Sequence, residues 1–400
     1  MTSTTGLAIA KPTSVILLLT LFLAEVLSAF ELSMLYPALK PMIAEFGDAQ
    51  AAGWVMTSFF ISSAVFAALC GRLGDLLGRK RLLQLVIVLS IIGSLVSGLS
   101  GSLAGLLVGR VIQGSSGAIF PLCIGLVREN VKSESVPMMI GILAATLTVT
   151  MGLGIFVGGL VVDNFGWRWI FWGGAMAGVI ALFAVSVNIP ALKQGGLNVM
   201  SGLNLTGGIL FAPALVVLLL TISKGSAWGW MSTYTLVSFG VGLLLLATWI
   251  TTELRAKKPL LDVRLLTDRK VLLVNLGSVV LGVSSFQSLQ LWSIILQQPT
   301  ETGVGLGASA SVTGLALLPK TLVALIAGPT AGWLIARYSG WVSLLVGSAI
   351  MLLMWTALLF NHSSVLTIAL LLTLLGFGMS TYYSGIPILI TRAVPMEKTS

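Results

Sequence analysis

Long apolar runs follow one another along almost the whole chain, and short polar segments separate them. A helix needs about 20 apolar residues to cross the hydrocarbon layer of a membrane, because each residue adds about 1.5 Å. Runs of this length lie near residues 14–37, 51–70, 82–99, 103–127, 137–161, 167–189, 204–223, 232–252, 271–296, 309–336, 341–360 and 364–391. The mean hydropathy of +1.04 and the 9% of charged residues exclude a soluble globule, where about a quarter of residues are charged. The sequence therefore predicts an all-α membrane protein with about 12 transmembrane helices.

The net charge of +9 is concentrated in alternate segments between the apolar runs. If the N-terminus is cytoplasmic, 17 of the 22 Lys and Arg residues fall on the cytoplasmic side, 3 in outer loops and 2 within spans. This positive-inside bias removes the reason to infer a nucleic-acid partner. We expect a multi-pass protein of the cell membrane, with a cytoplasmic N-terminus and anionic lipid at its basic side. The first run is too long for a signal-peptide core and is expected to be a true span.

Side chains suited to covalent catalysis or metal binding are few. Cys70 and Cys123 both fall in or at the edge of apolar runs, where they are expected to pack as small apolar side chains. The single histidine, His362, falls in an outer segment, and the sequence has no phosphate-binding GxxxxGK[ST] pattern. We therefore expect no enzyme activity, no cofactor and no metal.

The most distinctive polar segment is a glycine-spaced, charged one between the second and third runs. It reads Gly71-Arg72-Leu73-Gly74-Asp75-Leu76-Leu77-Gly78-Arg79-Lys80-Arg81. A generic positive-inside loop explains the last three cations, but it does not explain the glycines and Asp75 in register. The segment resembles the signature loop of the major facilitator superfamily of secondary transporters, in which it forms a cytoplasmic latch. The resemblance assigns this role to Gly71, Gly74, Asp75, Gly78, Arg79 and Lys80, although Leu76 replaces the usual Arg.

A weak internal repeat supports the same resemblance and refines it. Residues 332–340 echo the latch segment, and paired halves are typical of this superfamily. The echo lies between the tenth and eleventh runs, two spans later than in a twelve-span member. This displacement, the tryptophan-rich Trp167–Trp172 and the segment Pro259–Arg264 resemble the fourteen-span drug/proton antiporter group.

The resemblance implies a major facilitator-type helical bundle made of three parts. These are an N-terminal six-helix bundle at 1–190, two inserted helices at 191–258 and a C-terminal bundle at 259–400. Members of the group continue into two further spans, so the last bundle is expected to be incomplete and the sequence to be truncated at its C-terminus.

Two carboxyl side chains, Glu25 and Glu31, lie within the first apolar run. An ionised carboxylate is costly in hydrocarbon, so such residues face a cavity, find a partner or stay protonated. Glu25 is expected near the midplane, ~17 Å from the inner end of the span, and Glu31 at ~26 Å. Glu31 lies in a segment that resembles the family's acidic motif of the first span. Both are therefore candidate proton-coupling residues, and the alternative for Glu31 is that it reaches the outer surface.

Arg110 is the intramembrane cation of the N-terminal half, in Arg110-Val111-Ile112-Gln113-Gly114-Ser115-Ser116-Gly117. The stretch resembles the family's fourth-span motif. Its depth of ~11 Å from the outer end is similar to the ~9 Å of Glu31. An arginine can exchange partners when its carboxylate takes up a proton, so Arg110 is the candidate charge partner. The alternative is a static ion pair that only stabilises the bundle.

The fifth run contains Gly152-Leu153-Gly154-Ile155-Phe156-Val157-Gly158-Gly159, which resembles the fifth-span antiporter motif. Gly154, Gly158 and Gly159 are expected to permit close helix packing. Because Ile155 replaces the proline of that motif, simple packing is an alternative to a specific role in antiport.

Several polar and aromatic side chains of the C-terminal runs are candidates to line a substrate cavity. They are Gln287, Gln290, Trp292, Lys320, Tyr382 and Tyr383. The alternatives are interfacial or lipid-facing positions and, for Lys320, a side chain that reaches the membrane surface.

The resemblance implies a secondary active transporter, acting as a monomer, that couples protons to the export of small hydrophobic or cationic compounds by alternating access. A second hypothesis is a proton-coupled or facilitative importer of a metabolite, favoured by the degenerate fifth-span motif. A third is a non-transporting membrane sensor or an inactive remnant, favoured by the two missing spans.

Overall fold

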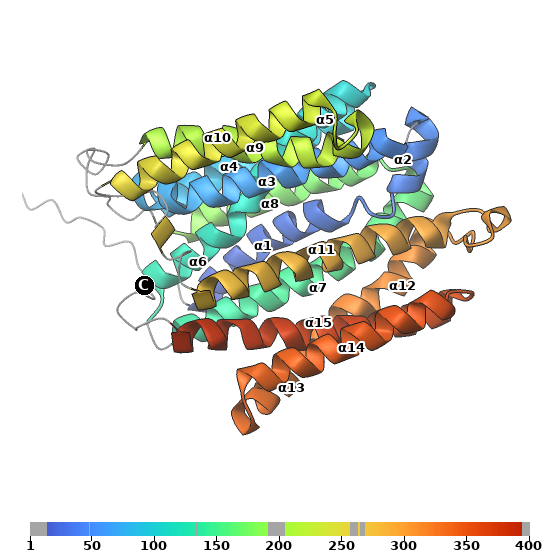
Figure 1. Cartoon of the computed structure of the whole chain (residues 1–400). Coiled ribbons are helices and arrows are strands. Elements are labelled where there is room, and N and C mark those ends of the chain that lie inside the picture. Colours follow the sequence, from blue (N-terminus) through green and yellow to red (C-terminus); the bar gives the residue numbers. More distant parts are fainter. Residues whose placement is uncertain are drawn as a thin grey trace, which may run out of the picture. The chain divides into compact units, whose positions relative to one another are not determined.

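A computed structural model describes residues 14–47, 49–132, 135–190, 205–256, 263–264 and 269–393 of the protein. Within these residues the regular elements are helices, and no strand occurs (Figure 1). The α-helices are α1 (Ser14–Ser33), α2 (Leu39–Phe46), α3 (Ala49–Leu77), α4 (Arg79–Leu99), α5 (Leu103–Gln113), α6 (Ile119–Asn130), α7 (Val136–Phe165), α8 (Trp169–Asn188), α9 (Leu205–Trp228), α10 (Thr233–Arg255), α11 (Arg269–Gln297), α12 (Ala310–Leu322), α13 (Ala324–Arg337), α14 (Gly340–Phe360) and α15 (Val365–Ala393). Two short 3-10 helices are η1 (Gly114–Ala118) and η5 (Thr300–Thr302).

Twelve segments within the described residues are long and apolar enough to cross a membrane. Each one overlaps one of the twelve predicted runs, so the prediction of an all-α protein with about twelve spans is confirmed. The agreement is close where a polar turn ends a run. Examples are Arg79–Leu99 against the predicted 82–99, and Gly340–Phe360 against 341–360.

The first span ends earlier than the sequence predicted. Helix α1 stops at Ser33, a turn follows, and a separate short helix, α2, begins at Leu39. Pro37 lies in this turn; it has no N–H to donate and disfavours helical geometry in the residue before it. The backbone instead makes short-range bonds, such as Tyr36 N–H to the carbonyl of Ser33 at 3.2 Å. The predicted end of the first span at residue 37 was therefore wrong.

The fourth span is interrupted by a tight 3-10 segment that the sequence analysis treated as continuous helix. Its α5 and α6 parts are joined by η1, and the Ser115 hydroxyl donates to the carbonyl of Val86 at 3.0 Å. Serine side chains compete for backbone partners in this way and distort helices. A Cβ on Gly114 would lie 2.9 Å from the carbonyl of Phe59, so glycine lets α3 come close to η1.

The charged segment at 71–81 is almost entirely helical, which corrects its description as a loop. Helix α3 continues to Leu77, and α4 begins at Arg79. Gly78 alone forms the turn, with a φ of 92° that favours glycine over other residues. The signature segment is thus a one-residue break between two long helices.

The tenth span consists of two helices, α12 and α13, which meet at Val323. Proline removes one N–H from the helical hydrogen-bond pattern, and Pro319 lies in the last turns of α12. The predicted span at 309–336 is therefore confirmed in position but is not one regular helix.

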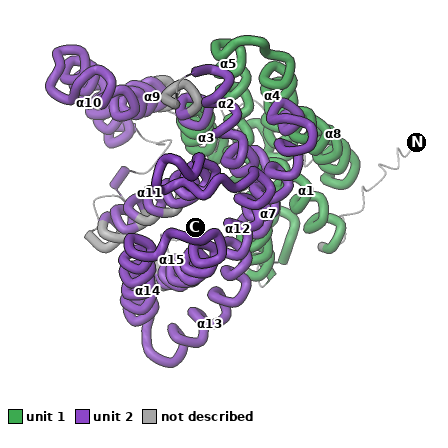
Figure 2. The backbone as a smooth tube through the Cα atoms, turned by 90° about the vertical axis from the view of Figure 1, so that its right-hand side faces the viewer, with its two compact units in different colours: residues 1–28, 58–146, 172–202 green, residues 29–57, 147–171, 203–400 purple. Residues whose placement is uncertain are grey.

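The protein divides into two compact units (Figure 2). The first, called unit 1, comprises residues 1–28, 58–146 and 172–202, and the second, unit 2, comprises residues 29–57, 147–171 and 203–400. The expected division at residues 190 and 258 stays a prediction.

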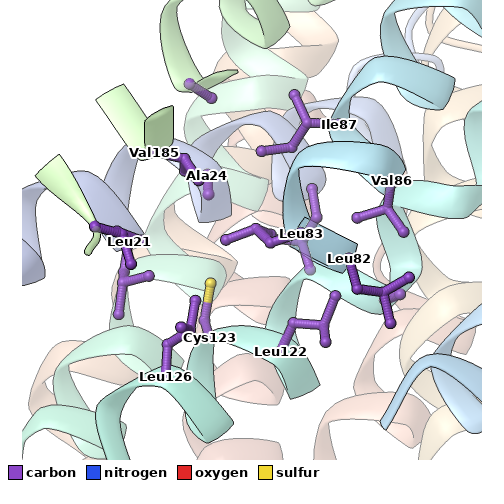
Figure 3. Close-up of a cluster of buried hydrophobic side chains, with 14 of the residues drawn as sticks. Leu21, Ala24, Leu82, Leu83, Val86, Ile87, Leu122, Cys123, Leu126 and Val185 are labelled. Atoms are coloured by element: carbon purple, nitrogen blue, oxygen red, sulfur yellow. The ribbon is translucent and has the colours of Figure 1, made fainter. Parts of the chain in front are cut away.

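Unit 1 has an apolar core to which α1, α3, α4, α6, α7 and α8 contribute. Leu21 of α1, Leu83 of α4 and Leu126 of α6 are completely or almost completely buried in it (Figure 3). Cys123 belongs to the same cluster and is a free, buried cysteine, as is Cys70. Both cysteines are therefore packing residues, as the sequence predicted.

In unit 2, helices α14 and α15 pack along one another, α15 also packs against α11, α12 and α13, and α9 packs against α10 (Figure 1). Small residues permit this close packing. A Cβ on Gly347 would lie 2.7 Å from the carbonyl of Gly378, and one on Gly242 would lie 2.7 Å from a Leu218 methyl carbon.

Candidate functional site

Both candidate acids of α1 are fully buried, each with 0% exposed surface. Glu25 belongs to the part of α1 in unit 1, and Glu31 belongs to the part in unit 2. The burial of Glu31 contradicts the alternative that it reaches the outer surface. A carboxylate that is removed from water needs a partner or a proton.

The Glu25 carboxyl lies against the Cys123 thiol of α6, in the apolar core of unit 1. Within the described residues, no nitrogen or oxygen donor bonds either of its carboxyl oxygens. Figure 3 shows the Cys123 sulfur among leucine side chains of α1, α4 and α6. An ionised Glu25 would therefore be desolvated beside a weak donor, whereas a protonated carboxyl carries no such cost.

The surroundings of Glu31 include the glycines of α7. A Cβ on Gly154 would lie 3.4 Å from a ring carbon of Phe30 and would overlap the Ser33 hydroxyl. A Cβ on Gly158 would lie 2.6 Å from the carbonyl of Met34. Two of the predicted packing glycines, Gly154 and Gly158, thus lie against the end of α1 and the turn that follows it.

Gly159 points to another element of unit 2. A Cβ on it would lie 2.8 Å from the carbonyl carbon of Ala310, at the start of α12. The Asp163 carboxylate, one helical turn further along α7, accepts the N–H groups of Ala310 at 3.2 Å and Ser311 at 2.7 Å. Helix N-termini leave such N–H groups without internal partners and favour negative charge. Helices α7 and α12 are thereby joined by close backbone packing and by a carboxylate cap.

The Arg110 side chain is fully buried in unit 1. Its guanidinium lies over the Phe59 ring, with 4.0 Å between the guanidinium carbon and the ring centroid. It also donates to the Gln113 side-chain oxygen, and the Gln113 amide donates to the Ser94 hydroxyl of α4 at 2.8 Å. Cation–π contact and hydrogen bonding therefore hold the cation in a fixed position.

Four residues of these sites were not predicted from the sequence, namely Phe59, Gln113, Ser94 and Cys123. Gln113 carried a usable signal, because it lies three residues after Arg110 on the same helix face. The other three are apolar or small residues in apolar runs, and only their packing partners distinguish them.

The predicted latch cations bind helix ends within unit 1. Arg79 donates to the carbonyl of Gly125 at 2.7 Å and forms an ion pair with Glu129 at 2.9 Å, both on α6. Lys80 donates to the carbonyl of Ser186 at 2.9 Å and to that of Ile189 at the end of α8. Cations at helix C-termini satisfy free carbonyls and complement the helix dipole.

The glycines of the latch segment differ in their surroundings. A Cβ on Gly74 would lie 2.8 Å from a Leu122 methyl carbon, so this glycine permits α3 and α6 to approach. A Cβ on Gly71 would meet nothing within 4 Å, and Gly78 forms the turn. The Asp75 side chain lies outside the described part of the protein.

The predicted cavity residues occupy different environments in unit 2. Lys320 and Trp292 are buried, Gln290 and Tyr382 are half-buried, and Gln287 and Tyr383 are exposed. The Lys320 ammonium donates to the buried Ser288 hydroxyl of α11. Burial contradicts the alternative that Lys320 reaches the membrane surface.

An ion pair outside the spans joins α2 to the segment before α8. The Arg168 guanidinium bonds both oxygens of Glu45, at 2.6 and 3.1 Å, and the Trp167 indole N–H donates to one of them at 2.8 Å. The Arg168 hydrogen bonds lower the pKa of Glu45 below its usual range. This bidentate geometry holds α2 against the start of α8.

The described residues contain no group of three or more His, Cys, Asp and Glu side chains that could hold a metal ion. A ring nitrogen of His362, two residues after α14 ends, lies 3.3 Å from the carbonyl of Leu358 in the last turn of that helix.

The part of the chain that the structure describes has twelve apolar spans, with two buried acids in the first and a buried arginine in the fourth. This arrangement is that of a multi-pass membrane protein of the kind found among secondary transporters. The family model of the Major Facilitator Superfamily matches residues 21–400, and the chain belongs to this superfamily.

Curated relatives carry names that refer to drug resistance. The chain is 28% identical over 348 residues to "Multidrug resistance protein Stp" of Mycobacterium tuberculosis, covering 86% of this chain and 63% of that protein. It is 23% identical over 369 residues to "Multidrug transporter protein MdtP" of Bacillus subtilis, covering 91% and 66%. It is also 26% identical over 352 residues to the "Tetracenomycin C resistance and export protein" of Streptomyces glaucescens, covering 86% and 63%. The chain thus spans less than two thirds of the length of these relatives.

Solved structures of the superfamily share the fold. A bacterial homolog of the human lysosomal transporter Spinster, inward-facing, matches with a TM-score of 0.62 and 14% identity, covering 97% of this chain and 77% of that one. The xylose transporter XylE from E. coli, partially occluded and inward-open, matches with a TM-score of 0.60 and 11% identity, covering 94% and 84%. The neighbours are transporters and not enzymes.

Proposed function

We propose that this protein is a secondary active transporter that uses protons to export small hydrophobic or cationic compounds by alternating access. The observation that carries the proposal is the complete burial of Glu25 and Glu31 within one membrane-spanning helix. A carboxyl in such a place can bind and release a proton with a large effect on its local energy. Relatives named for multidrug resistance and for export support export as the direction of transport.

In this proposal, proton uptake at an acid of α1 changes the balance between inward-open and outward-open states. A protonated carboxyl no longer attracts the guanidinium of Arg110, which then keeps only its uncharged partners. Those partners already exist, because Phe59 and Gln113 hold the guanidinium in place. Because the proton concentration differs across the membrane, the acid takes up a proton from one side and releases it to the other. This difference favours one conformational state at each step and drives export.

We further propose membership of the fourteen-span antiporter group, with α9 and α10 as the pair inserted between the two halves. These helices pack mainly on one another. The Lys224 ammonium at the end of α9 lies over the Trp54 ring, 4.5 Å from its centroid, within unit 2. The cytoplasmic N-terminus, the latch role of the segment at 71–81 and a monomeric state belong to this proposal.

The test uses the purified full-length protein in proteoliposomes with an imposed proton gradient and ethidium as the fluorescent hydrophobic cation. Glu31→Gln is expected to abolish gradient-driven flux, because an amide of nearly equal volume cannot carry the proton. Glu25→Gln shows which of the two glutamates carries the proton. Midplane depth and apolar surroundings favour Glu25, whereas resemblance to the family's acidic motif favours Glu31. Glu301→Gln makes the same change at an exposed residue and is expected to leave flux unchanged.

Arg110→Ala is expected to reduce flux more than either single glutamine substitution. It removes a fully buried cation and leaves the Gln113 side chain without its donor, a loss of several kcal/mol for buried charged networks. Flux that persists in both glutamine variants would reject proton coupling through α1. Flux that depends on Glu25 alone would assign the proton to Glu25.

A second candidate function is the import of a metabolite. Ile155 favours it, because it replaces the proline of the fifth-span motif that is associated with antiporters. Accumulation driven by an inward proton gradient would select import. An absence of flux under every gradient would favour a protein that senses and does not transport.

A further inference from the structure

We propose that Lys320, Ser288 and Trp292 form a binding site for the anionic group of a substrate, a carboxylate or a similar oxyanion. The inference rests on the proposed transport function and concerns its hydrophobic substrates: those bound at this site carry a negative group.

The first observation is a buried cation without an acidic partner. Lys320 has only 6% of its surface exposed, and its single bond within the described residues is the one to the Ser288 hydroxyl. No carboxylate of the described residues pairs with it. Because an ammonium has three donors, two remain for a ligand. A buried charge that lacks a counter-charge is costly, and a bound anion would supply one.

The second observation is a buried donor on the same face of α11. Trp292 lies one helical turn after Ser288, so the two side chains share a face about 6 Å apart along the axis. This face meets α12, because Ser288 contacts Lys320 there. The Trp292 indole is 5% exposed, and its N–H has no acceptor among the described residues. Buried indole N–H groups ordinarily have an acceptor.

The third observation is that the lysine stem cannot move away from α11. Gly376 of α15 packs directly against it: a Cβ there would lie 3.0 Å from the Lys320 Cγ and would overlap its carbonyl. A longer side chain at residue 376 would therefore displace the lysine. The α15 backbone thus closes this side of the lysine, and the ammonium bonds Ser288 on α11.

The Lys320 ammonium and the Trp292 indole N–H are thus buried hydrogen-bond donors with unused capacity. An oxyanion offers two or three acceptor oxygens, which match the free ammonium donors and the indole N–H. A ligand cation would instead be repelled by Lys320 at this position. The shared chemistry could also be supplied by a lipid phosphate, and we commit to the substrate because both donors are almost fully buried inside unit 2.

The test measures binding to the purified full-length protein in neutral detergent by calorimetry, which requires neither a gradient nor transport. The probes are naphthalene-1-acetate and its uncharged methyl ester. Lys320→Met is expected to weaken carboxylate binding at least about tenfold, the value of one charge-assisted hydrogen bond. Binding of the ester should change less than about twofold. Lys320→Arg, which keeps the charge, should retain most of the carboxylate binding, and Trp292→Phe should lose about threefold.

Lys40→Met is the matched control, because Lys40 is exposed on α2. It is expected to bind both probes as the parent does. Unchanged carboxylate binding in Lys320→Met would overturn the site, and so would an equal loss for acid and ester, which indicates a structural role. Displacement of the carboxylate by phosphatidylglycerol but not by phosphatidylcholine would assign the anion to lipid and overturn the substrate assignment. Binding that depends on Lys320 without flux in proteoliposomes would reject the transport function and leave the site in place.

Discussion

Substitution of Gly93 by alanine tests whether close packing of α4 and α5 positions the buried arginine. A Cβ on Gly93 would lie 2.7 Å from the carbonyl of Gly109 and 2.8 Å from the Gln113 Cα, and it would overlap the Gln113 N–H. These are backbone atoms, so the clash cannot be relieved by rotating a side chain. The helices must separate, and Gln113, which holds the Arg110 guanidinium, must move with them.

The magnitude follows from comparison with a second glycine of unit 1. An added Cβ in a packed interior costs about 1–3 kcal/mol, and more where backbone must shift. Alanine also has a higher helix propensity than glycine by about 1 kcal/mol, which works in the opposite direction. Gly141 of α7 has nothing within 4 Å of its added Cβ, so Gly141→Ala gains the propensity without a clash. The difference in stability between the two variants therefore isolates the packing cost.

The assay is thermal unfolding of both variants in the same detergent, followed by gradient-driven flux in proteoliposomes. Gly93→Ala is expected to unfold at least about 2 °C below Gly141→Ala and to lose most of its flux. Gly141→Ala is expected to match or exceed the parent in both measurements. Equal unfolding temperatures would refute the inferred backbone contact. A Gly93→Ala variant that loses the expected stability but keeps the flux of the parent would refute the link between this contact and Arg110.

Three further predictions concern the ends of the spans. Lys80→Met should lower stability by about 1 kcal/mol, measured by thermal unfolding, because the last carbonyls of α8 lose their donor. Glu45→Gln should destabilise by about 0.5 kcal/mol at pH 7, since the exposed pair with Arg168 is lost. Arg168 lowers the pKa of Glu45, so the pair stabilises the fold above the ordinary carboxyl pKa of about 4.3. This stabilisation is lost as the pH falls below that value, and the stabilities of parent and variant should then converge. A Lys224→Cys variant should react with a membrane-impermeant thiol reagent from outside, and a Lys257→Cys variant should not; the reverse pattern would invert the topology.

The positions of the spans could be predicted because a helix in hydrocarbon must satisfy its own backbone. Every span then appears as an apolar run of fixed minimum length. The interruptions were harder to predict. Glycine and serine are ordinary residues in membrane helices, so the run through Gly114 and Ser115 carries no distinct signal for η1. Its geometry depends on the contact between Ser115 and Val86, which are 29 residues apart in sequence.

The candidate site was predictable to the extent that charge in hydrocarbon is rare. Glu25, Glu31 and Arg110 could be selected from the sequence alone for this reason. Among the residues that contact them, Gln113 carried a sequence signal through its spacing from Arg110, whereas Cys123 and Phe59 did not. Cys123 and Phe59 belong to apolar runs, and their roles follow from the tertiary packing of α6 against α1 and of α3 against α5.

The latch segment illustrates how one set of residues can carry two signals. Its cations predict which side of the membrane is cytoplasmic, and in unit 1 Arg79 and Lys80 also bind carbonyls of α6 and α8. Substitution of either cation therefore changes helix-end stability as well as any coupling role. Asp75→Asn keeps both cations, so a loss of flux in that variant with unchanged unfolding temperature would be specific to the latch. If Lys80→Met loses flux only in proportion to its loss of stability, the lost bonds to the end of α8 explain the effect, and no latch role is needed.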